Sequence, residues 1–425
     1  MRSVAELLTL LLLVATYSLV LRKAIFLFAT KKITTAIALL PVIFIFYILP
    51  VLLDLVIGIP IYYKFRGFHE ASVSVTVAVI YNIYLSIFLI AILRYFRIYE
   101  RRIYNGDKRI YLAQKFKETV SKYEFIFVIF LISPLFAVFL SPDPSFYFTY
   151  KAITEADLTA RPDTHFIVAR SCQLAILSAS ILLFIEKRKF SKEIRLFRNI
   201  FVLLFVIASF WFFGKRSIVA YFAVSSLAIG VVSGQLTGKK FKRVAIIISI
   251  LFGVFILMYG KNIDSNWVVT YENMRIDFAR DAVLKFTIYR ENVIESPILE
   301  YDFQTFLFNL LFYIPREIWP GKPYPYAVYL TSAVLGTSNV TYLGWGLTTS
   351  ALSESIANSR WLGYFMGPLF ILGLCYLSDK SNRMITKAFG MLIVSLFMVI
   401  HFSAFTVVFL VFIFLIIKER VKIIF

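Results

Sequence analysis

Long apolar runs separated by short polar segments fill most of the chain, and their length predicts membrane-spanning helices. A helix needs about 20 predominantly apolar residues to cross a bilayer, and a helix satisfies its own backbone hydrogen bonds in lipid. We therefore expect an all-α, polytopic transmembrane bundle of about eleven spans, with 388–417 split at His401. The expected spans are 4–21, 33–56, 73–96, 124–141, 166–185, 199–213, 217–234, 244–260, 361–377, 388–401 and 403–417.

The connections between these runs alternate in charge, which predicts an orientation. Lys- and Arg-rich loops remain in the cytoplasm. The strongly basic connections are 22–32, 94–123, 186–198, 239–243, 378–387 and 418–422. The connections 57–72, 142–170 and 261–360 carry little net charge, so we expect these on the outer face, with the N-terminus outside and the C-terminus inside.

The same pattern predicts three parts: a membrane bundle over 1–260, a large outer segment over 261–360 and a second membrane part over 361–425. Composition agrees with this division. Hydrophobic residues make up 60% of the chain and charged residues 16%, with a mean hydropathy of +0.79. The net charge is +20, and the basic residues flank apolar runs. This placement suits membrane orientation and contact with anionic headgroups. The expected partner is therefore membrane lipid and not nucleic acid.

The outer segment is too long and too rich in aromatic residues for a linker. Tyr271 to Asn292 has apolar residues at helical spacing, which predicts an amphipathic helix. Asp277, Asp281 and Lys285 share another face at i, i+4 steps, with Arg280 beside them. Two interpretations remain open: a solvated face with local ion pairs, or a functional site.

Two further stretches of this segment have distinct patterns. Phe303 to Ile314 is apolar but too short to cross a bilayer, which predicts a re-entrant or interfacial segment. The prolines of 319–326 exclude a helix and predict a rigid, aromatic-rich loop. Its aromatic side chains suit either headgroup depth or stacking on sugar rings.

Short motifs narrow the chemistry. Lys215 and Arg216 form a predicted outer turn, where two cations run against the positive-inside preference; they indicate either a structural ion pair or a site for an anionic lipid-linked group. The sequence contains no D-x-D carboxylate pair, and the three histidines are scattered. We therefore expect no metal and no cofactor. Cys172 and Cys375 lie in apolar runs, which favours small core residues over a disulfide.

Two stretches resemble the Wzy-type oligosaccharide repeat unit polymerases. They are Arg275 to Asp281 with Leu284 to Phe286, and Ile314 to Pro325; Gly344-Trp345-Gly346 and the layout of many spans with one large late outer loop are similar as well. The resemblance implies an enzyme of the bacterial inner membrane whose large loop is periplasmic. It would join polyprenyl-diphosphate-linked oligosaccharides into O-antigen or a capsule-like polysaccharide, with a chain-length regulator protein as a further partner.

Transfer from a lipid diphosphate needs fixed cations for the departing charge, and arginine meets phosphate oxygens in pairs. The candidate diphosphate ligands are Lys215, Arg216, Arg275, Arg280 and Arg316. The candidate catalytic residues are Arg216, Arg316, Glu354 and Asp281, with His401, Asp277 and Glu317 as alternative bases. The candidate glycan-binding residues are Trp319, Tyr324, Tyr326 and Trp345.

Three other functions remain open at this point. An O-antigen ligase or another lipid-linked glycosyltransferase would share the arginines and differ in its acceptor. A transporter or flippase for lipid-linked oligosaccharide should carry ionisable residues deep in its spans or show repeated halves, and Asp54 and Arg170 lie only near predicted span ends. A non-catalytic assembly partner is the third.

Overall fold

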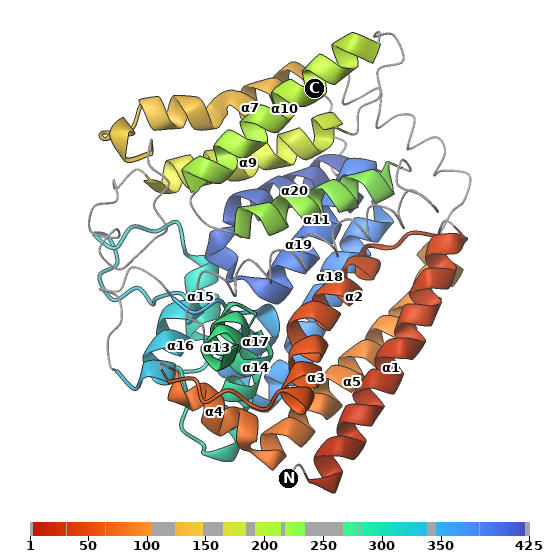
Figure 1. Ribbon diagram of the computed structural model, residues 1–425, viewed down its shortest axis with the longest axis vertical. Coiled ribbons are helices and arrows are strands. Elements are labelled where there is room, and N and C mark those ends of the chain that lie inside the picture. The colour runs from red at the N-terminus through yellow and green to blue at the C-terminus, as the bar shows by residue number, and fades with distance from the viewer. Residues whose placement is uncertain are drawn as a thin grey trace. The chain divides into compact units, whose positions relative to one another are not determined.

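The structure is a computed structural model, and in the part of the chain that it describes every regular element is a helix (Figure 1). The described residues are 3–30, 32–63, 65–103, 124–147, 165–183, 192–213, 217–233, 267–278, 280–337, 346–381 and 383–420. The predicted all-α class is therefore confirmed for these residues.

In the described part of the chain, six helical stretches are long and apolar enough to cross a membrane, and such a set is typical of a multi-pass membrane protein. They are Val4–Ala29, Thr35–Val56, Val75–Arg101, His165–Leu183, Leu196–Phe213 and Ala351–Lys380. Each overlaps a predicted span. Four more predicted spans coincide with shorter helices, namely α7 (Glu124–Phe139), α11 (Ser217–Val232), α19 (Met384–Val399) and α20 (Thr406–Arg420). The span predicted at 244–260 lies outside the described residues, and the count of eleven remains a prediction.

The chain forms two compact units. Unit 1 comprises 1–104, 238–379 and 393–406, and unit 2 comprises 105–237, 380–392 and 407–425. The boundaries predicted at 260 and 360 follow the expected topology, a different criterion from compactness, and they remain a prediction.

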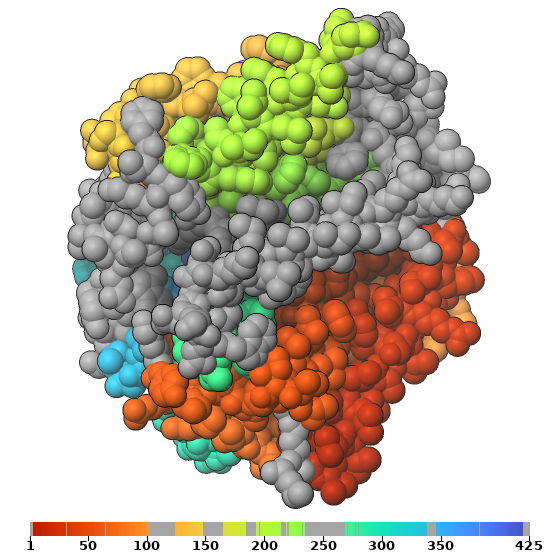
Figure 2. All heavy atoms as spheres, viewed as in Figure 1, coloured from red at the N-terminus to blue at the C-terminus, as the bar shows by residue number. Residues whose placement is uncertain are grey.

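Unit 1 contains α1 (Val4–Ala29) and α5 (Val75–Ile98), which lie side by side (Figure 1). Leu13, Val20 and Leu27 of α1 are fully buried, whereas Leu8 and Leu11 are 62% and 66% exposed. Figure 2 shows the side chains of α1 along the surface, in red. A helix that is apolar on its outer face as well as its inner one suits a lipid environment.

The second span of unit 1 is an interrupted helix. Its pieces are η1 (Thr35–Ala38), α2 (Leu39–Ile43), the π-helical turn η2 (Phe44–Ile48) and α3 (Leu49–Val56). Pro50 removes a backbone donor just after the π turn, and such irregular turns need outside hydrogen bonds. Tyr81 supplies one by donating its hydroxyl to the Tyr47 carbonyl at 2.7 Å.

Polar contacts fix the end of unit 1 at which η1 begins and α5 ends. The Asp379 carboxylate, at the C-terminal end of α18 (Gly363–Lys380), accepts hydrogen bonds from the Thr34 hydroxyl, the Thr35 backbone N–H and the Tyr95 hydroxyl. Glu100 pairs there with Lys23 at 2.6 Å. The contact between Lys23 of α1 and Glu100, just after α5, therefore holds the C-terminal parts of these two helices together.

The segment predicted to lie outside is mostly helical. Its elements are α13 (Trp267–Asp277), α14 (Arg280–Ile288), the π turn η5 (Tyr289–Val293), α15 (Gln304–Leu310), α16 (Tyr326–Leu335) and α17 (Ala351–Ser359). The predicted amphipathic helix is thus two helices with a break after Phe278. The stretch expected to be re-entrant contains only the short α15. Helix α16 begins at Tyr326, the last residue of the predicted rigid loop, so this residue is helical whereas 319–325 are not.

A tight hairpin joins α17 to α18, within the stretch Ala351–Lys380. The backbone reverses at Arg360, which has a φ of 48°. A Cβ on Gly363 would lie 2.2 Å from the Ser355 carbonyl oxygen, although residues eight apart in a straight helix are separated by about 12 Å. Since α18 alone has 18 residues, it is about 27 Å long, close to the thickness of a bilayer core.

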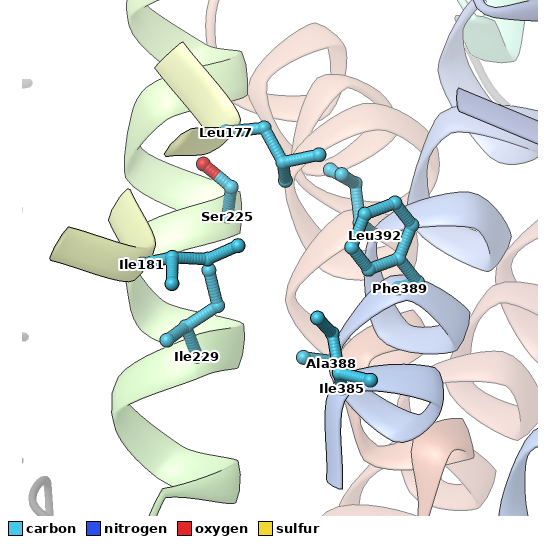
Figure 3. Close-up of a pocket in the computed structure, with 8 residues that line it drawn as sticks. All are labelled: Leu177, Ile181, Ser225, Ile229, Ile385, Ala388, Phe389 and Leu392. Atoms are coloured by element: carbon cyan, nitrogen blue, oxygen red, sulfur yellow. The ribbon is translucent and has the colours of Figure 1, made fainter. Parts of the chain in front are cut away.

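Unit 2 contains α7, η4 (Pro144–Tyr147), α9 (His165–Leu183), α10 (Lys192–Phe213), α11, the first part of α19 and most of α20. Leu177 and Ile181 of α9, Ile229 of α11 and Phe389 of α19 border a small apolar cavity (Figure 3). It has room for no more than a water-sized molecule, so it is a packing defect rather than a substrate site.

Replacing Gly363 by alanine should destabilise the protein by about 1–3 kcal/mol, because the methyl group would force the backbones of α17 and α18 apart. Gly373→Ala is the matched control in the same helix, since a Cβ there meets nothing within 4 Å, and it should be neutral or stabilising by up to about 1 kcal/mol. Thermal unfolding in detergent micelles measures both. Equal midpoints for the two variants would contradict the hairpin packing.

Candidate functional site

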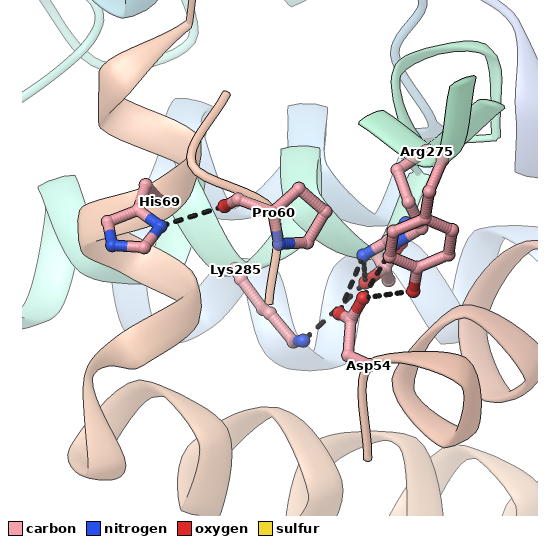
Figure 4. A network of polar contacts seen from close by, with 7 residues as sticks. Asp54, Pro60, His69, Arg275 and Lys285 are labelled. Atoms are coloured by element: carbon pink, nitrogen blue, oxygen red, sulfur yellow. Dashed lines mark hydrogen bonds and ion pairs between the residues drawn. The ribbon is translucent and has the colours of Figure 1, made fainter. Parts of the chain in front are cut away.

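A buried ionic network joins α3 to α13 and α14, which lie more than 200 residues later in the sequence. Arg275 of α13 donates to Asp54 of α3 through Nε and Nη2, and to Asp281 of α14 through Nη1 and Nη2, with all four N···O distances 2.9 Å (Figure 4). The Tyr271 hydroxyl donates to Asp54 Oδ1 at 2.6 Å. The side chains of Arg275, Asp54 and Asp281 are at most 1% exposed. This guanidinium therefore binds both carboxylates in the paired geometry that arginine favours.

Helix α14 is buried along its whole length despite its charges. All nine residues from Arg280 to Ile288 are buried, and the helix packs against α4 (Arg66–Val73), α5 and α17. Lys285 lies 3.5 Å from Asp281 Oδ2 and 5.2 Å above the Tyr81 ring. The alternative of a solvated charged face is therefore wrong for Arg280, Asp281 and Lys285, because each is enclosed and paired instead.

The network sets the protonation state of Arg275. Burial lowers the pKa of its guanidinium, but the neighbouring Asp281, Tyr62 and Asp54 more than offset this, and the pKa lies well above its usual range. Charges taken out of water persist only when they are paired and hydrogen-bonded. Arg275 thus remains charged and committed to its two carboxylates.

The loop between α3 and α4 closes over this network. The Tyr63 backbone N–H donates to Glu272 of α13 at 2.9 Å, and His69 contacts the Pro60 carbonyl at 2.8 Å (Figure 4). Tyr62 has a φ of 54° and is fully buried. A non-glycine residue holds such a conformation only where its surroundings impose it, so the loop is fixed by its contacts with α13 and α4.

A second polar cluster surrounds Glu354 of α17. Its Oε1 accepts hydrogen bonds from the Thr305 hydroxyl at 2.9 Å and from Asn309 Nδ2 at 2.7 Å. Asn358, one turn later, binds the backbone of Thr305 through its side-chain oxygen at 3.0 Å. Glu354 is 6% exposed, and within the described residues its Oε2 accepts no hydrogen bond.

The loop 311–325 is held by its own two cations. Arg316 donates to the carbonyls of Lys322 and Pro323 at 2.6 and 2.8 Å and lies 3.9 Å from the centre of the Tyr324 ring. Lys322 donates to the Phe312 and Ile314 carbonyls at 2.6 and 2.7 Å. Burial, followed by the nearby Arg316 charge, lowers the pKa of the Lys322 amine. Arg316 therefore shapes the loop and presents Tyr324, which is 38% exposed.

The end of α19 and the turn 400–405 after it contact α14 and the loop 311–325. Arg280 Nε donates to the Val399 carbonyl at 2.6 Å, directly before the turn that carries His401. In that turn His401 Nδ1 and the Ser403 hydroxyl are 2.7 Å apart, and Phe402 packs on Phe312 of the loop. The loop after α15 therefore lies against the turn that carries His401, and Arg280 contacts the residue just before this turn.

The remaining predicted site residues have different environments. Glu317 is exposed and Trp319 is half-buried. Tyr326 is 1% exposed, with its hydroxyl 2.8 Å from the Thr287 hydroxyl, so its ring belongs to the core around α14. Asp277 is the last residue of α13, and its side chain lies outside what the structure describes. Lys215, Arg216 and Trp345 also lie outside the described residues.

Sequence reasoning missed several residues of these clusters. Asp54 was visible as a lone carboxylate at the end of an apolar run, and this is the signal that could have identified it, because such residues are rare and paired in membranes. Thr305, Asn309 and Asn358 carry no distinguishing spacing. They become part of the site only because α15 packs against α17.

No group of three or more His, Cys, Asp or Glu side chains in the described ranges is arranged to hold a metal ion. Comparison of the chain with models of known protein families, with curated proteins and with solved structures finds no match.

Replacing Asp54 by asparagine should destabilise the protein by about 3–5 kcal/mol, because it leaves part of the buried Arg275 charge uncompensated. The double variant Asp54→Asn/Arg275→Gln should lose less free energy of unfolding than the two single variants lose together, since the two side chains interact directly. Equilibrium unfolding in detergent gives these energies.

Asp302→Asn is the control for this cycle. Its partner Arg360 is 3.9 Å away and both side chains are more than half exposed, so the change should cost less than about 1 kcal/mol. An Asp54→Asn variant as stable as this control would show that the network does not hold α13 and α14 in place.

Proposed function

We propose that this protein is a glycosyltransferase that joins polyprenyl-diphosphate-linked oligosaccharides into a polysaccharide, at the outer face of a bacterial inner membrane. The observation that carries the proposal is the enclosed helix α14, which bears Arg280 and Lys285 and packs against α17, the helix of Glu354. A low-dielectric site with fixed cations and a base suits a reaction that expels an anion. The resemblance of 275–286 and 314–325 to the Wzy-type polymerases supports the same reaction.

The chemistry assigns distinct roles to these groups. A hydroxyl oxygen of the incoming lipid-linked unit attacks the anomeric carbon of the growing chain. The bond from that carbon to the diphosphate oxygen breaks, and its electron pair leaves with the polyprenyl diphosphate. Glu354 Oε2 takes the hydroxyl proton, and a cation stabilises the departing diphosphate. No nucleotide sugar is consumed.

We assign the cations two kinds of role, one in holding the fold and one in binding the substrate. Arg275 is committed to Asp54 and Asp281, so we assign it a positioning role. Arg280, next to the His401 turn, and Arg316, under Tyr324, are the described candidates for the diphosphate, with Lys215 and Arg216 as further candidates. Tyr324 and Trp319 are the described candidates for binding the glycan.

Two other functions are the alternatives to this proposal. A ligase would use the same donor chemistry with another acceptor. A transporter of lipid-linked oligosaccharide is favoured by the Asp54–Arg275–Asp281 network, because buried ionisable residues in a membrane protein commonly line a transport path. The full pairing of that network favours a structural role instead.

The deciding experiment supplies the purified protein in lipid nanodiscs with a defined polyprenyl-diphosphate-linked repeat unit, without nucleotide sugar. The proposal predicts a ladder of products and one polyprenyl diphosphate released per new bond. A single addition to another acceptor would indicate a ligase. In a parallel assay with the protein in proteoliposomes, movement of the lipid-linked unit from one leaflet to the other without a new glycosidic bond would indicate a transporter.

Glu354→Gln should lower the rate of polymer formation by about 10²–10⁴-fold, because the amide cannot accept the hydroxyl proton. The glutamine oxygen can still accept the bonds from Thr305 and Asn309, so the fold should be retained. Glu70→Gln is the matched control, because Glu70 is exposed on α4, and it should keep wild-type rates. Polymer formed at the wild-type rate by a folded Glu354→Gln variant would exclude Glu354 as the base.

A further inference from the structure

We propose that the turn between α17 and α18 carries a sugar-binding platform. In it, Trp361 and Tyr364 hold a ring of the glycan chain, while Tyr84 and Asn292 bond its hydroxyl groups. The class of ligand rests on the proposed function, but these four residues are separate from the residues assigned above to catalysis and binding.

The platform is a pair of stacked aromatic rings. The ring centroids of Trp361 and Tyr364 are 5.5 Å apart, with an interplanar angle of 26°, and Trp361 is 64% exposed. Flat aromatic faces present a large apolar surface to a ligand at low entropic cost, and the apolar face of a sugar ring fits such a surface.

The surrounding contacts fix this pair in place before any ligand arrives. The Tyr84 ring of α5 meets the Tyr364 ring edge-on, with centroids 4.9 Å apart, and the Tyr364 hydroxyl donates to Asn292 Oδ1 at 2.7 Å. Gly363 packs against Ser355, which sets the direction in which α18 begins. A binding surface that is already ordered loses less entropy when it binds.

Two buried polar groups beside Tyr364 lack partners. The Tyr84 hydroxyl and Asn292 Nδ2 are both inaccessible and form no hydrogen bond with the described residues, and Tyr84 is 4% exposed. Leaving such a group unpaired is destabilising, and native proteins retain few of them. A sugar hydroxyl both donates and accepts, so hydroxyls of a ring at this position could satisfy both groups after a small opening of the side chains.

An exposed tryptophan in a membrane protein can also serve as an anchor at headgroup depth. That role would explain Trp361, but it would not explain the unpaired Tyr84 hydroxyl and Asn292 amide beside its stacking partner. The two explanations differ in whether the Tyr84 hydroxyl matters for binding a soluble sugar.

The test measures binding of soluble oligosaccharides to the full-length protein in nanodiscs by titration calorimetry. The probe is the set of oligosaccharides released by mild acid from the surface polysaccharide of the host cell. Trp361→Ala and Tyr84→Phe should each weaken binding by about tenfold or more, the factor that corresponds to one lost hydrogen bond or stacking contact. Tyr84→Phe removes only an unpaired buried hydroxyl, so its thermal stability should be unchanged or higher.

Phe365→Ala is the matched control, because Phe365 is 63% exposed on the same helix, and it should bind as the wild type does. Wild-type affinity in both Trp361→Ala and Tyr84→Phe, or no binding by the wild type itself, would overturn the proposal. The fluorescence of Trp361 is the part of the emission that the Trp361→Phe variant lacks. If brominated lipids quench this fluorescence and the oligosaccharides do not change it, the proposal is likewise overturned. Normal binding by a protein that forms no polymer would refute the proposed function and leave the platform standing.

Discussion

The pairing of Arg275 with two carboxylates is the constraint on which the rest of unit 1 depends. One guanidinium, 1% exposed, joins α3 to α13 and α14 through four hydrogen bonds. A buried charge deprived of its partner is strongly destabilising, so the three elements can only be buried together. Within this arrangement α14 packs against α4, α5 and α17, and α17, which bears Glu354, packs against α15. The position of the candidate base Glu354 therefore depends on helices that the ionic network holds together.

The described cations around this framework all donate to groups of the protein itself. Arg275 donates to the carboxylates of Asp54 and Asp281, and Lys322 donates to the Phe312 and Ile314 carbonyls. Arg280 donates to the Val399 carbonyl beside the His401 turn, and Arg316 donates to the Lys322 and Pro323 carbonyls while its guanidinium lies against the exposed Tyr324 ring. Preorganised charges of this kind contribute most where water is excluded, which is the environment that the enclosed α14 provides.

The apolar runs predicted the helical class and the positions of six long helices, because a bilayer imposes both helix and length on any segment that crosses it. The proline-rich loop before Tyr326 was predictable for a similar local reason, since proline excludes a helix. The ionic network was not. Asp54 and Arg275 are 221 residues apart, and whether Asp281 faces water or a guanidinium depends on a partner that periodicity cannot reveal. The same holds for Glu354, whose partners come from α15.

The central claim is that the end of unit 1 bearing this network faces the exterior, opposite the end where Lys23 pairs with Glu100. Single-cysteine labelling of intact cells with a membrane-impermeant maleimide tests it most directly, because both natural cysteines are buried. Tyr313→Cys, on the exposed loop, should be labelled without permeabilisation, whereas Arg22→Cys should be labelled only after it. The reverse pattern would place the site in the cytoplasm and contradict transfer between lipid-linked glycans at the outer face.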